Sequence, residues 1–475
     1  MAYPDWVERE KRPGTNISCS KGKYYLYEVS SVWDPVKKRA QKKTGKYLGR
    51  ITEEGLIPPK PKKTVVAEGV STKEYGASSF LNHAGHELHE ALKEYFPEDA
   101  DRIFTLAVLR VMEKCPFKRA AFLYERSFMS EYCKGLSLSG SSLSAFLERL
   151  GTKRTQLAGF MREQLSGEQY VLFDGTNIIS NSKKMDINRF GYNSHRVYDP
   201  QINLLYAFSA STHKPGFYRV LPGNIRDVTA FKQCVDESGI ENVVVVADKG
   251  FGSESNFKML EENKLQYIVP LKRNSGLIQR DRLMTGSKAA FDGHFMFNNR
   301  VIWYYSYVTD GKRILVYLDS DLQNKEEKDY IRRIEESCED YSEEGFLEKQ
   351  YSFGTIAFRT NIDDTPQNLF LLYKTRGEIE QSFDFLKNLL EQDHTYLQSA
   401  NAVEAWAFIN HISLLLVYDI YDRLRKAELL SKYSVDDFLI YLKYIHAVKT
   451  NSSWVVGEIS GKTQKLLDKL DLHIT

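Results

Sequence analysis

Four polar side chains that could act on a phosphate group lie close together in the stretch 371-LLYKTRGEIEQSFDFLKNLL-390. At about 100° per residue of α-helix, they share one face about 60° wide. They are Tyr373, Arg376, Glu380 and Lys387. A carboxylate flanked by two cations and an aromatic ring suits a site that binds a metal ion and a phosphate together. The alternative is a surface helix whose charged face meets only water, and the helix by itself favours that alternative.

Two more carboxylates follow apolar runs that we predict to be strands. Asp174 ends QYVLFD (169–174), and Asp248 ends VVVVAD (243–248). The β-branched run before Asp248 is typical of a strand buried on both faces. In open α/β sheets, sites form beyond the carboxyl ends of such strands. An aspartate there is costly without a cation or a hydrogen-bond donor, although Asp248 could instead cap a helix that begins near 253-SESN-256.

Asp174, Asp248 and Glu380 form a set of carboxylates from separated parts of the chain. Two-metal phosphoryl transfer needs such a set, because two Mg²⁺ ions about 3.5–4 Å apart activate the attacking oxygen and stabilise the leaving one. Ligand sets made only of oxygen favour Mg²⁺, with Mn²⁺ as a substitute, over zinc. Such a site needs no nucleophilic side chain, and the sequence has no G-x-S-x-G motif.

The segment 373-YKTRGEIEQSFDFLK-387 fits the pattern Y-x-x-R-x-x-x-E-x-x-x-x-x-x-K. It resembles the signature of a group of bacterial insertion-sequence transposases that have an Asp-Asp-Glu active site. Three more blocks resemble those of the same family, in the same order: 172-LFDGTN-177, 222-PGNIRD-227 and 246-VADKGFGSESN-256. The 132 residues from Asp248 to Glu380 fit members with a β-rich insertion before the Glu. The resemblance covers residues 165–400, about half of the chain.

This resemblance implies an RNase H-like catalytic core with two bound Mg²⁺ ions. The implied metal ligands and catalytic residues are Asp174, Asp248 and Glu380. The implied contacts to DNA phosphates are Tyr373, Arg376, Lys387 and Lys249, the last at a position where the family often has Arg. Three other carboxylates compete in principle, but they lie away from the signature position or suit a helix cap: Asp227, Asp384 and Glu391.

The family's mechanism is hydrolysis at each transposon end, which frees a 3′-OH, followed by attack of that 3′-OH on target DNA. The implied partner is double-stranded DNA, both as terminal inverted repeats and as target. Pairing of two ends implies at least a homodimer on DNA. Two other functions stay open: a DNA-binding protein derived from such an enzyme that has lost its activity, and an RNase H-fold nuclease that cuts without joining.

The elements that must position these residues follow the order β-β-β-α-β-α-β from residue 169 onward, which is typical of a mixed sheet flanked by helices. A hairpin is expected around the turn 199-DPQ-201, a strand at 217-FYRVLPG-223 and a helix from Asp227. Residues 275–365 interrupt this order with a hairpin around 310-DGK-312 and a charged helix at 323–341.

The expected fold class is therefore α/β, an RNase H-like mixed sheet flanked by helices, with a β-rich insertion and helical regions on either side. We expect six parts: a basic β-rich segment at 1–70, a helical and possibly DNA-binding module at 71–166, the first part of the core at 167–274, the insertion at 275–365, the second part of the core with the Glu helix at 366–400, and a helical C-terminal region at 401–475.

Charge and composition narrow the class of protein. Residues 1–70 hold 15 Lys or Arg against 8 Asp or Glu, a net +7 in a chain whose total is +2, so this end is a candidate contact for a polyanion. The five cysteines form no C-x-x-C pair, which favours a reducing compartment and argues against structural zinc. The apolar run 405-AWAFINHISLLLVY-418 is too short to span a bilayer and predicts a buried helix. The expected location is the cytoplasm, with no membrane contact.

Three weaker patterns have ordinary interpretations. The histidines of 83-HAGHELH-89 do not share one helical face, so we expect a solvated helix surface rather than a metal site. The segment 457-GEISGKT-463 is one residue short of a phosphate-binding loop, and we reject nucleotide binding there. Aromatic residues alternating through 295–309 could stack on bases, but they are more typical of a sheet core.

Overall fold

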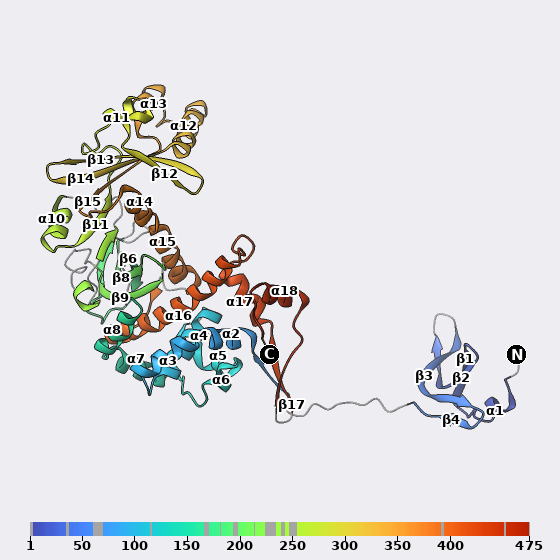
Figure 1. Ribbon diagram of the computed structural model, residues 1–475. Coiled ribbons are helices and arrows are strands. Elements are labelled where there is room, and N and C mark those ends of the chain that lie inside the picture. The colour runs from blue at the N-terminus through green and yellow to red at the C-terminus, as the bar shows by residue number, and fades with distance from the viewer. Residues whose placement is uncertain are drawn as a thin grey trace. The chain divides into compact units, whose positions relative to one another are not determined.

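The computed structural model describes residues 3–34, 38–59, 70–114, 116–165, 171–180, 182–192, 198–212, 214–223, 234–238, 243–246, 254–390, 394–450 and 453–474. The chain divides into two compact units, Met1–Gly69 and Val70–Thr475 (Figure 1). Each unit has its own hydrophobic core.

The first unit is a four-stranded antiparallel sheet beside one short helix. The sheet order is β1-β2-β3-β4. Its small core consists of Val7, Ile17, Leu26 and Ile51. The elements are α1 (Asp5–Glu8), β1 (Thr15–Ser20), β2 (Lys23–Asp34), β3 (Arg39–Thr52) and β4 (Gly55–Ile57).

The second unit begins with a short strand and a module of helices. Their buried faces repeat at helical spacing, and α4 is buried along nearly its whole length because it packs against α16 (Ala400–Lys426). The elements are β5 (Ser71–Glu74), α2 (Gly76–Ala84), α3 (His86–Tyr95), α4 (Ala100–Glu113), η1 (Phe117–Arg119), α5 (Ala120–Arg126), α6 (Met129–Tyr132), α7 (Gly140–Gly151) and α8 (Arg154–Glu163).

A mixed sheet forms the centre of the second unit. Strand β8 is antiparallel to both β6 and β9, whereas β10 is parallel to both β6 and β11. The order β9-β8-β6-β10-β11 is the arrangement expected of an RNase H-like core, so the predicted mixed α/β fold is confirmed. The elements are β6 (Val171–Ser180), β7 (Arg189–Tyr192), β8 (Tyr198–Ser209), β9 (Pro215–Pro222), β10 (Val243–Val246), α10 (Glu254–Glu262) and β11 (Gln266–Pro270).

Two details of this sheet differ from the sequence-based expectation. Strand β6 does not end at Asp174 but continues to Ser180, because β8 pairs with it as far as Ile179. The predicted turn 199-DPQ-201 is instead part of β8, where Pro200 pairs with Phe190 of β7. A proline can lie within a strand where its neighbours in the sheet do not need its missing N–H group. The sequence around Pro200 does not show that β7 pairs with it, so the local pattern indicates a turn.

The β-rich insertion extends the central sheet and does not form a sheet of its own. Strand β15 pairs with β11 on one side and with β14 on the other, both antiparallel. The predicted hairpin turn at 310–312 joins β13 to β14. The elements are α11 (Asp281–Met284), η3 (Lys288–Ala290), β12 (Gly293–Phe297), β13 (Arg300–Thr309), β14 (Lys312–Asp319), α12 (Ser320–Glu335), α13 (Glu343–Lys349), η4 (Gln350–Ser352) and β15 (Thr355–Thr360).

The sequence predicts a helical C-terminal region, but the structure also has two strands there. Strand β17 pairs with β18 and also with β5, more than 370 residues earlier in the chain, in a three-stranded sheet. Short strands such as these are set by their distant partner and carry little local signal. The elements after α16 are α17 (Val435–Lys443), β17 (His446–Thr450), β18 (Ser453–Val456) and α18 (Gly461–Lys469).

Helix α16 is the central helix of the second unit. By length and composition it could cross a membrane, but 78% of its most apolar 18-residue window is buried inside the protein. It contacts α4, α7 and β9. The apolar run at 405–418 therefore lies in a core helix, as predicted.

Candidate active site

The site is built around one edge of β6. Strand β8 occupies the other edge from Val171 to Ile179. On the site's edge, β10 pairs with β6 only up to Phe173, and β16 (His394–Thr395) pairs with it at Ile179 and Ser180. Residues 174–178 therefore lie between two parallel partners, at the level where β10 ends. That level is where sites form in open α/β sheets.

The first two predicted carboxylates belong to this level. Asp174 follows directly on Phe173, which pairs with Val245 of β10. The backbone of Asp174 pairs with Tyr206 of β8, whereas its side chain lies outside the described residues. Asp248 and Lys249 also lie outside them, and Asp248 follows the last residue of β10 by two positions. Their roles remain predictions.

The third carboxylate lies on α15 (Arg376–Asp384), and α15 contacts β6 (Figure 1). The stretch 371–390 is not one uniform helix, however. Helix α14 (Pro366–Lys374) ends at Thr375, whose hydroxyl donates to the carbonyl of Leu372 at 2.6 Å. After α15 the chain widens into the π-helix η5 (Phe385–Leu389). A constant 100° per residue therefore does not hold from Tyr373 to Lys387.

Glu380 is held in place by its helix while its carboxylate reaches solvent. Its side chain is 64% exposed, and its Oε1 lies 3.5 Å from an Nη of Arg376, one helical turn earlier. Within the described part of the chain, Glu380 pairs with Arg376. A pair so exposed contributes little to stability, so the carboxylate keeps its capacity to bind a cation.

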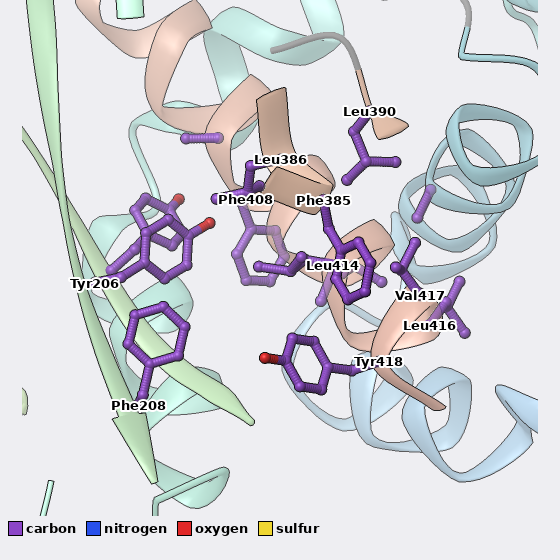
Figure 2. Close-up of a cluster of buried hydrophobic side chains, with 14 of the residues drawn as sticks. Tyr206, Phe208, Phe385, Leu386, Leu390, Phe408, Leu414, Leu416, Val417 and Tyr418 are labelled. Carbon is purple, nitrogen blue, oxygen red and sulfur yellow. The ribbon is translucent and has the colours of Figure 1, made fainter. Parts of the chain in front are cut away.

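The buried side of η5 anchors the end of the Glu helix. Leu386 and Leu390 are 1% and 0% exposed. Figure 2 shows them with Phe385 against α16. The Phe385 ring meets those of Tyr418 and Tyr421 edge-on, at 5.8 and 5.4 Å between centroids.

Arg110 of α4 is a second anchor, although a basic residue of this module suggests from sequence alone a contact with DNA. Its side chain is buried and donates to the carbonyl of Leu390 and, at 3.0 Å, to Oδ1 of Asn410 on α16. One guanidinium thus joins the helical module, the central helix and the end of η5. An arginine inside an otherwise apolar helix, here RIFTLAVLRVM, is the sequence signal that could have indicated this role.

The predicted DNA-contacting residues are only partly brought together. Tyr373 is half-buried on α14, with its ring 4.3 Å from that of Phe358 on β15. Arg376 lies beside Glu380, and Lys387 is half-buried in η5. Their contact with DNA stays a prediction.

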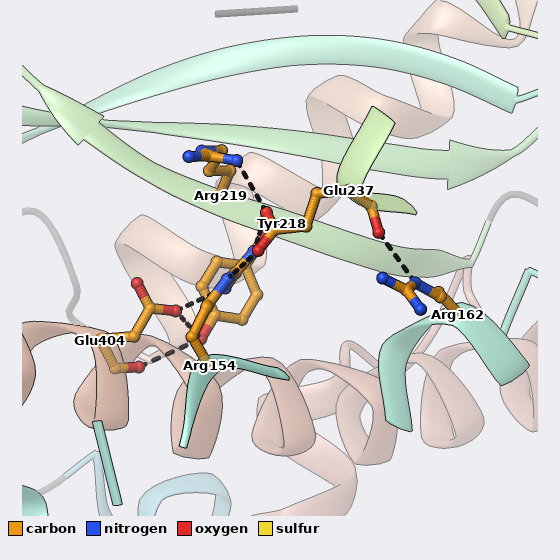
Figure 3. Close-up of polar contacts among 6 residues, drawn as sticks. All are labelled: Arg154, Arg162, Tyr218, Arg219, Glu237 and Glu404. Atoms are coloured by element: carbon orange, nitrogen blue, oxygen red, sulfur yellow. Dashed lines mark hydrogen bonds and ion pairs between the residues drawn. The ribbon is translucent and has the colours of Figure 1, made fainter. Parts of the chain in front are cut away.

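A polar cluster joins the helical module to the core (Figure 3). Arg154, which begins α8, donates to both oxygens of Glu237 at 2.7 and 2.8 Å and to Glu404 of α16 at 2.6 Å. Tyr218 of β9 donates to the same Glu404 oxygen at 2.9 Å. Burial by itself would raise the pKa of Glu237, but hydrogen bonds from Arg154 and the charge of Arg219 hold that pKa below its usual value.

The prediction of a solvated surface for the histidine-rich segment 83–89 is wrong at His89. His89 is buried, stacks on Phe104 with 4.3 Å between ring centroids, and bonds to Asp101 at 2.9 Å. Cys133 lies nearby, so three potential ligand atoms are within 4.8 Å of one another. This group belongs to the helical module and includes none of the predicted catalytic carboxylates. Stacking and the hydrogen bond already account for the position of His89.

The family model of the transposase DDE domain matches residues 165–416, which is more than half of the chain. The chain belongs to the DDE transposase family. The matched region begins just before β6 and ends within α16, so it contains all three predicted carboxylates. Members of the family cleave and join nucleic acid and depend on divalent metal ions.

One solved structure is also similar to this chain. A solved structure of piggyBac transposase in a synaptic complex with hairpin DNA has 12% sequence identity and a TM-score of 0.37, and it covers 72% of this chain and 70% of its own. A similarity of that size carries no argument about the site. No curated protein matches the sequence.

Proposed function

We propose that this DDE transposase mobilises an insertion sequence by cutting DNA at both transposon ends and joining the freed 3′-OH groups to target DNA. The observation that carries the proposal is the convergence at β6. Strand β6, which carries Asp174, pairs with β10, the strand before Asp248 in the sequence, and contacts α15, the helix of Glu380. The three carboxylates of the signature are separated by 74 and 132 residues in the sequence.

The donor set fits divalent magnesium. All three predicted ligands are carboxylates, and the described one, Glu380, is exposed and only loosely paired. Hard oxygen donors of this kind suit Mg²⁺, with Mn²⁺ as a substitute. Bound between Asp174, Asp248 and Glu380, two Mg²⁺ ions would supply activation of the attacking oxygen and stabilisation of the leaving one.

The chain's own residues bind and orient the DNA backbone in this proposal. Arg376 lies within one helical turn of Glu380 and can reach a phosphate held at that carboxylate. Tyr373, Lys387 and Lys249 would contact the neighbouring phosphates. Packing of η5 on α16, and Arg110 at the end of η5, fix the helix and with it the direction of the Glu380 side chain.

The proposed partners are the terminal inverted repeats and the target, both as double-stranded DNA. Because two ends must be paired before joining, a homodimer would form on DNA. The proposed location is the cytoplasm, at the bacterial nucleoid, where both substrates are found, without a membrane partner.

The test is cleavage and joining of a labelled duplex taken from the DNA that flanks the coding region, with Mg²⁺ present. We expect Glu380→Gln, Asp174→Asn and Asp248→Asn each to lower strand cleavage by at least about a thousandfold, since each removes a charged ligand of the catalytic ions. Circular dichroism and the unfolding midpoint should stay at wild-type values.

Asp384→Asn is the matched control, because Asp384 is also exposed on α15, where it accepts a hydrogen bond from Asn388 at 2.5 Å. It should cut at nearly the wild-type rate. Wild-type cleavage by the Glu380→Gln protein would overturn the assignment. Cleavage without any joined donor–target product would instead indicate a nuclease, and binding without cleavage by the wild-type protein would indicate an inactive derivative.

A further inference from the structure

The first unit carries a two-stranded arm that extends beyond the rest of its sheet. Strand β1 pairs with β2 only as far as Glu28, and β4 pairs with β3 only from Arg50. Beyond these points β2 and β3 pair with each other alone, from Val29↔Thr44 to Asp34↔Arg39. We call residues 29–34 and 38–44 the β2–β3 arm. At about 3.3 Å per residue its six-residue strands reach about 20 Å.

The β2–β3 arm has no hydrophobic core on either face. Ten of its thirteen residues are exposed, among them Trp33 at 64% and Val32 at 52%. Adjacent residues of a strand point to opposite faces, so an exposed apolar side chain is present on both. An isolated two-stranded ribbon is marginally stable in water. A partner that covers both faces would stabilise a ribbon of this kind.

The charge of the β2–β3 arm indicates which kind of partner. The arm has one carboxylate, Asp34, and four cations: Lys38, Arg39, Lys42 and Lys43. Within the described part of the chain, none of these cations forms an ion pair. Sheets commonly place opposite charges across from each other, as Arg39 and Asp34 are here, but Lys42 and Lys43 lie across from Ser31 and Ser30. Their charge is therefore left for a ligand.

The cations are distributed over both faces. Lys42 shares a face with Trp33, because Trp33 pairs with Ala40 two positions before it, whereas Lys43 lies on the opposite face with Val32. A flat anionic surface would need cations on one face only. A groove with a phosphate backbone along each wall suits a ribbon with cations on both.

We propose that the β2–β3 arm binds double-stranded DNA by entering the major groove. The B-form major groove is about 12 Å wide and accepts a two-stranded β-ribbon. In this position Lys42 and Lys43 contact phosphates on opposite walls, and Trp33 lies against base edges near the tip. This inference rests on the proposed function for its choice of DNA as the polyanion.

The test measures binding of the full-length protein to a fluorescein-labelled, random-sequence duplex of 30 base pairs by anisotropy, over a range of salt concentrations and in EDTA. The variant Lys42→Gln/Lys43→Gln should bind at least about tenfold more weakly at 0.1 M salt. The slope of log K against log salt should fall in magnitude by about 1.8, since each lost phosphate contact removes about 0.9.

The matched control is Lys11→Gln/Lys23→Gln, which removes the same charge from exposed positions of the same unit outside the arm. It should change affinity less than about twofold. Equal losses in both double variants would mean that net charge alone acts, and an unchanged affinity in Lys42→Gln/Lys43→Gln would mean that the arm does not bind DNA. Either result overturns the proposal.

Competition with double-stranded RNA of the same sequence separates groove entry from simple attraction to phosphate. A-form RNA has a deep, narrow major groove that a ribbon does not enter. The RNA duplex should therefore compete at least about tenfold less well than DNA, and equal competition would exclude groove entry. EDTA removes catalysis from the measurement. If Glu380→Gln stops cleavage but Lys42→Gln/Lys43→Gln leaves binding unchanged, only the arm proposal fails. If Lys42→Gln/Lys43→Gln weakens binding but Glu380→Gln still cleaves, only the proposed function fails.

Discussion

At the scale of single residues, exposure and burial separate groups that act on a ligand from groups that hold the fold. Glu380 projects a carboxylate into solvent from α15. His411 on α16 is the opposite case. It is fully buried between the rings of Tyr206 and Tyr218, and neither ring nitrogen has a hydrogen-bond partner among the described residues. Such a residue makes the fold sensitive to pH.

Burial lowers the pKa of His411 to about 3, below the 6.5 of an unburied histidine. Between pH 6.5 and 3, His411 therefore binds a proton in the unfolded chain but not in the folded chain. The stability that depends on neutral His411 is fully present above about pH 6.5 and is lost as the pH falls from there toward 3. The expected loss is about 1.4 kcal/mol per pH unit in that window. His411→Leu should lose less stability than the wild type between pH 7.5 and pH 5.0, as measured by urea unfolding.

The control for this prediction is His473→Gln, since His473 is 81% exposed at its side chain. Its pH dependence should match that of the wild type. A wild-type acid dependence in His411→Leu would mean that His411 is not the residue responsible.

At the scale of elements, the position of α15 depends on the π-helix that follows it. Widening at η5 turns Phe385, Leu386 and Leu389 toward the core and lets the chain return to β6 through β16. Arg110 then binds the carbonyl at the end of η5. The Glu helix is therefore held at its C-terminal end by packing, while its exposed face stays available.

Leu386→Ala should lower the free energy of unfolding by about 2–5 kcal/mol, because it leaves a cavity where a 1%-exposed leucine packs. Urea unfolding measures this. We expect cleavage to fall as well, since the Glu helix loses its anchor. The matched control is Asn388→Ala, which alters an exposed residue of the same η5 segment and should cost less than about 1 kcal/mol. Similar losses in both variants would show that packing does not anchor this helix.

At the scale of the whole second unit, Arg154 connects parts that are far apart in the sequence. It joins α8 to Glu237 and to Glu404 of α16, and the side chains of Arg154, Glu237 and Glu404 are 25%, 20% and 15% exposed. Breaking a pair this sheltered leaves carboxylates without a partner. The helical module is thereby attached to the core by charge as well as by apolar packing.

Arg154→Met should lower the free energy of unfolding by on the order of 3 kcal/mol. Arg154→Lys should recover only part of this, because an ammonium group cannot reproduce the two-pronged contact with Glu237 together with the bond to Glu404. Arg162→Met is the comparison variant, since Arg162 gives a single bond to the Glu237 carbonyl at 2.8 Å. If Arg154→Lys is as stable as the wild type, the fork geometry is not what stabilises this junction.

The sequence by itself determined the order of the three carboxylates, the signature around Glu380 and the alternation of strands and helices in a mixed sheet. Each of these depends on neighbours in the chain: a β-branched run before Asp248, helical spacing from Arg376 to Glu380, a hairpin turn at 310–312. The tertiary structure alone decided that β6 continues past Asp174 and that α14 and α15 part at Thr375. It also decided that β17 and β18 join β5 and that Arg110 holds the end of η5. These features depend on pairing and packing between segments up to hundreds of residues apart, and a partner's register is not written in the local pattern of either segment.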